Sequence, residues 1–226
     1  MEQADHPLAD LYARSEATAP SEYDYESPVG RARWARWLLG LTVVAEAATL
    51  IAYAAQRSLL NRGLGEITLA EWNRSSSRIS ALALVLLVLL GLTAVFFLRW
   101  VHLSFRNLRS LGLSTRFTPG WAVGFWFVPV LSLVRPKQIV DELWERTDDT
   151  MVGQTSSVIP IWWGLWIVGN VTEWIATRLG DGTLGELKTR NAVFLVAHGL
   201  QLAAAACAFW LVGKLTERQV ARASRV

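Results

Sequence analysis

The chain of 226 residues has little cysteine, little histidine and little charge. Its single cysteine, Cys207, excludes an internal disulfide framework and any metal centre built from several thiolates. Charged residues make up 18% of the chain, below the roughly 25% usual for soluble domains. The net charge is +3, but basic residues in a membrane protein mainly set its orientation. We therefore expect no nucleic-acid partner.

Long apolar runs are abundant. Hydrophobic residues reach 52%, and the 12 Trp residues suit a chain that crosses membrane–water boundaries repeatedly. A helix needs about twenty residues to cross roughly 30 Å of hydrocarbon. Four segments are long enough, namely residues 37–55, 79–98, 158–176 and 192–213. The sequence therefore predicts an all-α integral membrane protein with the lipid bilayer as its first partner.

A fifth apolar segment, residues 117–134, is shorter and contains Pro119, Gly120, Gly124 and Pro129. Five crossings would place 11 Lys and Arg residues on each side of the membrane, whereas four crossings place 15 inside and 7 outside. Only the second distribution obeys the positive-inside rule. We predict four transmembrane helices, both termini in the cytoplasm, and a re-entrant or interfacial segment at 117–134. A kinked fifth span is the alternative.

The two ends of the chain differ in composition from the middle. Residues 1–30 hold seven acidic side chains, one arginine and three prolines, a composition that predicts a disordered acidic tail. Residues 31–215 form the predicted helical membrane domain. Residues 216–226 are basic, and the ordinary interpretation of such a tail is attraction to anionic lipids.

Two helical segments are expected on the cytoplasmic side. The span at 79–98 continues into basic residues at helical spacing, and Gly112 supplies a stop. Residues 136–146 place Ile139, Val140 and Leu143 on one face and acidic residues on the others. This pattern predicts a short amphipathic helix that lies on the inner membrane surface or packs under the bundle.

Polar side chains inside the spans are the candidates for function, because ionisable groups in lipid are costly. Glu46 lies near the middle of the first span. Helix depth predicts that Glu173 and His198 meet in the outer half of the bundle, with Asn170 and Gln201 close by. The cluster is either a proton-linked or cation-binding site, or a set of interhelical hydrogen bonds that only holds the helices together.

Patterns of catalysis and of cofactor binding are missing. No Gly-x-Ser-x-Gly, His-Glu-x-x-His or Gly-x-x-x-x-Gly-Lys-Ser/Thr pattern occurs. His102 lies at the inner end of its span and His198 near an outer end, so they are separated by about 20 Å and cannot share a haem iron. We expect no metal, no cofactor and no enzymatic activity.

The segment between Asn107 and Trp144 carries a family resemblance. The residues that carry it are Asn107, Gly112, Pro119, Gly120, Trp121, Gly124, Pro129, Arg135, Pro136 and Trp144. These positions resemble an uncharacterised family of bacterial membrane proteins, domain of unknown function 4328, over roughly residues 35–215. The resemblance implies a multi-helix protein of a bacterial cell (plasma) membrane, and it brings no activity or catalytic residue.

Two functional hypotheses follow from this pattern. The first is a non-enzymatic scaffold, accessory or regulatory membrane component that acts by association with a membrane-protein partner or with itself. It rests on abundant anchoring and packing residues and on the missing catalytic patterns. The alternative is a small transporter or channel-like protein that uses the intramembrane polar cluster and the proline-broken segment.

Overall fold

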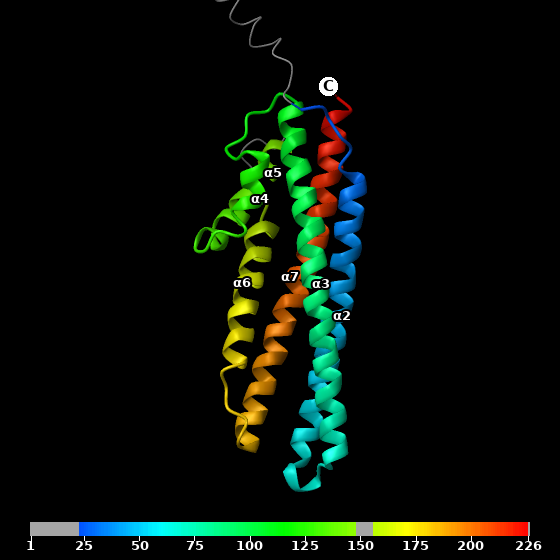
Figure 1. Ribbon diagram of the computed structural model, residues 1–226, viewed down its shortest axis with the longest axis vertical. Helices are drawn as coiled ribbons and strands as arrows, with labels where there is room; N and C mark the ends of the chain where they lie inside the picture. The colour runs from blue at the N-terminus through cyan, green and yellow to red at the C-terminus, as the bar shows by residue number, and fades with distance from the viewer. Residues whose placement is uncertain (1–22, 148–155, 226) are drawn as a thin grey trace, which may run out of the picture.

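The computed structural model describes residues 23–147 and 156–225, and helices are the only regular elements in these ranges. The first 22 residues of the predicted acidic tail lie outside the described residues. Figure 1 shows long helices running side by side along one axis. The elements are α2 (Val29–Arg62), η1 (Leu64–Glu66), α3 (Leu69–Ser110), α4 (Pro119–Gly124), η2 (Leu131–Leu133), α5 (Arg135–Thr147), α6 (Val158–Ala176) and α7 (Leu184–Ala223).

Three helices of the described residues, α2, α3 and α7, are long and apolar enough to cross a membrane. They contain 34, 42 and 40 residues, which at 1.5 Å per residue gives about 50–60 Å, well beyond the hydrocarbon core. The predicted spans at 37–55, 79–98 and 192–213 each lie inside one of these helices, and 158–176 coincides with α6. Hydropathy located the apolar middle of each helix. The helical spacing of the basic residues after 98 also predicted the C-terminal extension of α3, whereas the polar extensions of α2 and α7 were not predicted.

The tightly packed core is at the end of the molecule where the C-terminus lies (Figure 1). By contrast, the apolar stretch of α3 leaves Leu84, Leu87 and Leu90 about 60% exposed. Lipid solvates such side chains as well as protein does, whereas outside the membrane they must be buried. The residues of the core with 2% exposure or less include Trp100, Phe105, Leu108, Ile139, Leu143 and Val212.

Polar side chains join α3 to α7 inside this core. Trp100 donates from Nε1 to Oγ1 of Thr216 at 3.0 Å, and Gln219 donates from Nε2 to the carbonyl of Ser104 at 2.9 Å. Because a buried polar group without a partner costs free energy, these bonds fix which residues of the two helices face one another. Thr216 and Gln219 belong to the predicted basic tail at 216–226, and in the structure α7 continues through this stretch to Ala223.

Local sequence signals explain where the long helices begin and end. Thr68 accepts from the backbone N–H of Glu71 while the Glu71 side chain accepts from that of Thr68, a capping box that starts α3. Thr183 and Glu186 start α7 in the same way. At the far end of α3, Gly112 has a φ of 72°, which glycine adopts without strain. The predicted stop at Gly112 is therefore confirmed.

The segment 117–134 contains no long helix. Its only α-helix, α4, has six residues and spans about 9 Å, so a continuous fifth transmembrane helix is excluded here. The chain then turns at Val130, whose φ of 66° is unusual for a β-branched residue. The end of the segment is held to α6 because Trp163 donates from Nε1 to the carbonyl of Leu133 at 2.8 Å.

The predicted amphipathic helix at 136–146 is α5, and it packs against the bundle. Its apolar face buries Ile139, Val140 and Leu143 to 2% exposure or less. Glu142 lies on the same buried side, and its Oε1 accepts from the backbone N–H of Arg116, ahead of α4. α5 thus links the loop after α3 to the core.

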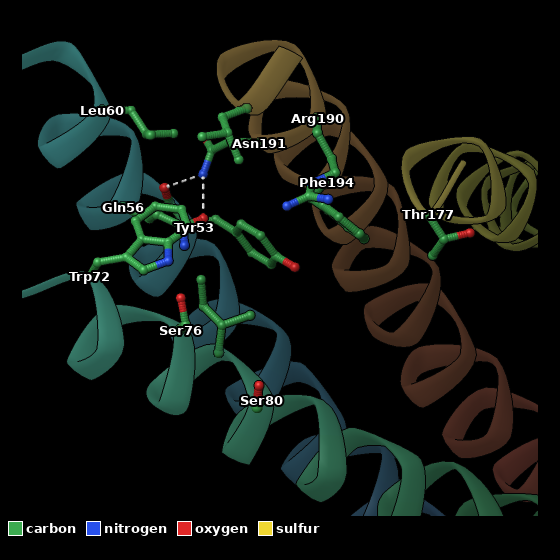
Figure 2. A pocket seen from close by; sticks show the side chains of 12 residues that line it. Tyr53, Gln56, Leu60, Trp72, Ser76, Ser80, Thr177, Arg190, Asn191 and Phe194 are labelled. Carbon is green, nitrogen blue, oxygen red and sulfur yellow. Dashed lines mark hydrogen bonds between the residues drawn. The ribbon is translucent and has the colours of Figure 1, made fainter. Parts of the chain in front are cut away.

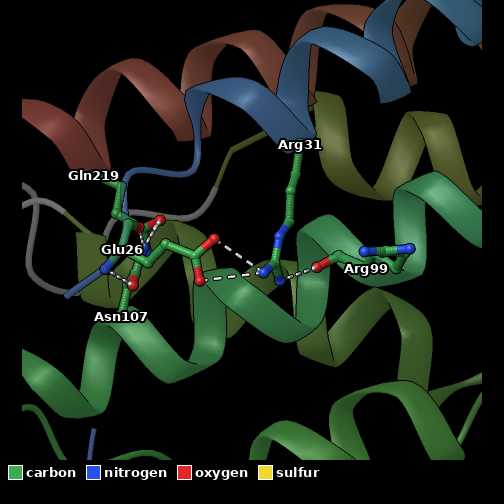
Figure 3. Close-up of polar contacts among 5 residues, drawn as sticks. All are labelled: Glu26, Arg31, Arg99, Asn107 and Gln219. Atoms are coloured by element: carbon green, nitrogen blue, oxygen red, sulfur yellow. Dashed lines mark hydrogen bonds and ion pairs between the residues drawn. The ribbon is translucent and has the colours of Figure 1, made fainter. Parts of the chain in front are cut away.

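The predicted disordered tail extends too far along the chain. The structure begins α2 at Val29, inside the predicted range of 1–30. Just before it, the backbone of Glu26 pairs with the side chain of Asn107 through two hydrogen bonds of 3.1 and 2.7 Å (Figure 3). Asn107 is fully buried, so a tertiary contact holds a stretch whose composition predicts disorder.

Glu142 predicts a dependence of stability on pH. Burial raises the pKa of this carboxyl above its ordinary value, outweighing the opposing hydrogen bond from Arg116 and the charge of Arg146. A carboxyl whose pKa is higher in the folded than in the unfolded chain destabilises the fold as the pH rises above the pKa of the unfolded chain. The reason is that the unfolded chain loses this proton at a lower pH than the folded chain does. Glu142→Gln keeps an acceptor oxygen and removes the charge, so its stability relative to wild type should increase from pH 4.5 to 7.5.

Thermal unfolding in detergent across this pH range measures the effect. Glu145→Gln, on the same helix and only half-buried, is the matched control and should follow wild type. A constant difference between Glu142→Gln and wild type at all pH values would contradict the prediction.

Candidate functional site

The strongest candidate for a functional site is a buried polar pair between α2 and α7. Nδ1 of His198 and Oε2 of Glu46 share a hydrogen bond of 2.8 Å. The two residues are only 6% and 7% exposed, and both lie within the apolar parts of helices able to span a membrane. A hydrogen bond of this kind holds one proton between an imidazole and a carboxyl group, the two groups most used for proton transfer.

Aromatic rings connect this pair to the end of the bundle where α2 ends and α7 begins. The Tyr53 ring stacks on His198 at 5.3 Å between centroids and on Phe194 at 5.0 Å. Tyr53 and Phe194 come from α2 and α7, the helices that supply Glu46 and His198. The stacking restricts the rotation of the His198 imidazole and places apolar ring surface on one side of the Glu46–His198 pair.

A cavity of about 260 Å³ opens beside these rings (Figure 2). It lies between α2, α3 and α7, and Thr177 at the end of α6 closes one side. Its lining mixes aromatic, hydroxyl, amide and guanidinium groups, a mixture typical of sites for small polar molecules. The lining residues are Tyr53, Gln56, Leu60, Trp72, Ser76, Ile79, Ser80, Thr177, Leu187, Arg190, Asn191 and Phe194.

Asn191 is the most constrained polar residue of the cavity. Its Nδ2 donates to the carbonyl of Tyr53 and to Oε1 of Gln56, both at 3.1 Å. The side chain is 3% exposed, and its Oδ1 atom is buried without a hydrogen-bond partner among the described residues. Buried acceptors are normally paired, so this oxygen lacks the partner that such a group usually has.

The other predicted polar residues lie around α6. The structure pairs His198 with Glu46 rather than with Glu173, which is half-buried on α6. Asn170 is exposed and donates to the carbonyl of Trp166 on its own helix at 2.7 Å. Gln201 packs closely against the backbone of Gly169 on α6. A side chain at position 169 would collide with Gln201. Of the five predicted residues, the structure therefore joins only Glu46 and His198.

The sequence patterns did not indicate the residues that line the cavity. Gln56 directly follows the predicted first span, and Asn191 directly precedes the predicted last one. Polar residues at such positions look like ordinary span boundaries. Tyr53 looks like an interfacial anchor. The available signal was that Gln56 and Asn191 sit at matching ends of helices that both carry a buried ionisable residue.

The residues of the family-like motif lie at the other end of the molecule. Pro119 occupies the first turn of α4, and Thr118 caps that helix by accepting from the backbone N–H of Trp121 at 3.2 Å. The Trp144 ring on α5 stacks on Trp210 of α7 at 6.0 Å. The Arg135 guanidinium lies over aromatic rings of the same region. The motif therefore builds the packed end and contributes nothing to the Glu46–His198 pair.

Within the described residues, no group of three or more His, Cys, Asp or Glu side chains is arranged to hold a metal ion. The described chain is all-helical, and its three long apolar helices define the class of multi-helix proteins suited to a membrane.

Comparison with protein families then identifies the chain. It belongs to the family described as domain of unknown function (DUF4328), whose model matches residues 65–217. No curated protein and no solved structure matches it. The expected family is confirmed, but the match begins at the loop before α3, so it does not include α2 and Glu46.

A double-mutant cycle tests whether Glu46 and His198 act as a pair. Glu46→Leu and His198→Phe each leave one buried polar group unpartnered, and we expect each to lower the free energy of unfolding by about 1–3 kcal/mol. The double variant removes both groups and keeps an aromatic ring against Tyr53. It should be more stable than either single variant, with a coupling of about 0.5–3 kcal/mol.

Chemical unfolding in detergent provides the measurement. Glu173→Leu combined with His198→Phe is the matched control, and their effects should add to within about 0.5 kcal/mol. Additivity in the Glu46–His198 cycle would show that the two side chains do not stabilise each other.

Proposed function

We propose that the protein binds a small polar molecule in the outer half of its helix bundle and acts as a small transporter or channel-like protein. The observation that carries the proposal is the buried Glu46–His198 hydrogen bond beside a cavity with a polar lining. Ionisable residues in membrane helices typically mark substrate or ion pathways. Structural hydrogen bonding alone would explain the pair, but it would not explain the cavity.

The cavity favours a ligand with a hydrogen-bond donor. The Oδ1 of Asn191, which has no hydrogen-bond partner among the described residues, would accept only from an N–H or O–H group. Ser76 and Ser80 add hydroxyl groups, while Trp72 and Phe194 supply rings for an apolar part. A small amine, amide or alcohol fits this combination. The proposal includes no catalytic step.

We further propose four transmembrane helices in a bacterial plasma membrane, with both termini in the cytoplasm. α6 is the fourth span: its 19 residues give about 28 Å, close to the hydrocarbon thickness. It runs beside α7 and is rich in tryptophan (Figure 1). The segment 117–134 then lies in the cytoplasmic headgroup region, and 15 of the 22 basic residues face the cytoplasm.

Single cysteines in a Cys207→Ala background test this topology on intact cells with an impermeant thiol reagent. Gly65 lies between α2 and α3, and Asp181 lies between α6 and α7. We expect the cysteines of Gly65→Cys and Asp181→Cys to be labelled from outside. Ser114→Cys lies between α3 and α4 and should be labelled only after the cells are opened. Protection of Asp181→Cys in intact cells would remove α6 from the spans.

Association with a protein partner is the second candidate function. It is favoured by an exposed apolar arm, residues 119–134, in which Trp121, Phe127 and Val130 are 56%, 72% and 75% exposed. Such a surface either inserts into the membrane interface or covers another protein. A scaffold or accessory role would use this arm rather than the cavity.

Native mass spectrometry of the full chain, released gently from its own membrane, distinguishes the two functions. Ligand binding predicts a defined small-molecule adduct that is lost in Asn191→Ala and kept in Asn170→Ala, an amide substitution outside the cavity. A protein released without any small adduct overturns the binding proposal. A reproducible protein partner that is lost when Phe127 is changed to Ser supports association instead.

A further inference from the structure

We propose that Arg99, beside the Glu26–Arg31 ion pair, binds the phosphate of an anionic phospholipid at the cytoplasmic boundary between α2 and α3. A second cavity, of about 320 Å³, opens at this position. It is at the opposite ends of α2 and α3 from the cavity around Asn191, so the two sites are independent. Its lining residues are Glu26, Ser27, Gly30, Arg31, Trp34, Phe96 and Arg99.

The charges at this cavity leave one positive group uncompensated (Figure 3). Arg31 donates from Nη2 to both carboxylate oxygens of Glu26, at 3.0 and 3.1 Å. The guanidinium of Arg99 makes no hydrogen bond or ion pair with any residue that the structure describes, while its carbonyl accepts from Nη1 of Arg31 at 3.5 Å. Glu26 therefore balances Arg31, and Arg99 remains to attract an anion.

The site is held in place before any ligand arrives. The Glu26 backbone is fixed by the buried Asn107 through two hydrogen bonds. Because Glu26 is fixed, its carboxylate orients Arg31 toward α3. A guanidinium suits phosphate oxygens because it offers paired donors in one plane.

The surroundings match a lipid better than a free phosphate ion. Arg99 directly follows the predicted span at 79–98, and Trp34 precedes the one at 37–55, so both lie at headgroup level. The rings of Trp34 and Phe96 lie 6.1 Å apart between centroids. They join α2 and α3 on the membrane-interior side of the arginines. Toward the membrane interior, the exposed side chains of Trp37 and Val95 continue the same helix faces. A diacyl lipid would place its phosphate on Arg99 and an acyl chain along this apolar surface.

The placement at a headgroup level follows from the helix sequence alone, and only the choice of the cytoplasmic leaflet rests on the proposed topology. Basic pockets between membrane helices on the cytoplasmic side are known to favour anionic headgroups. Arg78 offers a matched control because it precedes the same span by one residue, at the opposite boundary, and is likewise exposed.

The experiment titrates the purified full chain in detergent with phosphatidylglycerol and counts bound lipids by native mass spectrometry. Wild type should bind the first phosphatidylglycerol more tightly than phosphatidylcholine. Arg99→Gln should weaken that binding by about fivefold, as expected for one arginine at a lipid surface. Arg78→Gln should leave it unchanged, and both variants should retain the wild-type unfolding temperature.

Three outcomes would overturn the proposal. Equal weakening in Arg78→Gln and Arg99→Gln would indicate general electrostatic attraction without a site. Equal binding of both lipids to wild type would remove the role of the anionic headgroup. Displacement of phosphatidylglycerol by millimolar inorganic phosphate would assign the arginines to a free anion.

Discussion

Helices that cross lipid gain little by burying leucine against one another, because hydrocarbon solvates leucine equally well. This bundle must therefore be held together in other ways. At the end where the C-terminus lies, aromatic and aliphatic side chains around Trp100 pack into a hydrophobic core. Within the apolar stretches, specific polar contacts such as Glu46 with His198 join helices distant in sequence. The long apolar face of α3 stays exposed because lipid can solvate its side chains.

The same constraint separates the molecule into two structurally different ends. The packed end carries the family-like motif, α4, α5 and the arginine cavity, and it is built from hydrogen bonds and buried rings. At the other end a cavity opens beside Asn191, whose Oδ1 has no hydrogen-bond partner among the described residues. The proposed ligand would bind in this cavity, while the packed end keeps the helices in register.

α2 contributes to both proposed sites although the family model begins after it, at residue 65. It supplies Glu46 and Tyr53 to the proposed ligand site and Arg31 to the proposed lipid site. In each case the other partner comes from α3 or α7, within the matched region. The function proposed here therefore depends on contacts between the matched region and the helix that precedes it.

The sequence by itself determined the class of protein, because apolar length and helix capping are local properties. It located the apolar part of α2, α3 and α7, the bounds of α6, the stop at Gly112 and the amphipathic α5. It also selected Glu46 and His198, since an ionisable residue in an apolar run is conspicuous in any fold. It could not choose the partner of His198, because depth along the membrane leaves the rotation of each helix open. Only the tertiary structure decided that His198 faces α2 rather than α6, that Asn107 holds residue 26, and that Gln56 and Asn191 line one cavity. Those outcomes depend on which helix faces meet, and helix faces are set by packing across the whole bundle.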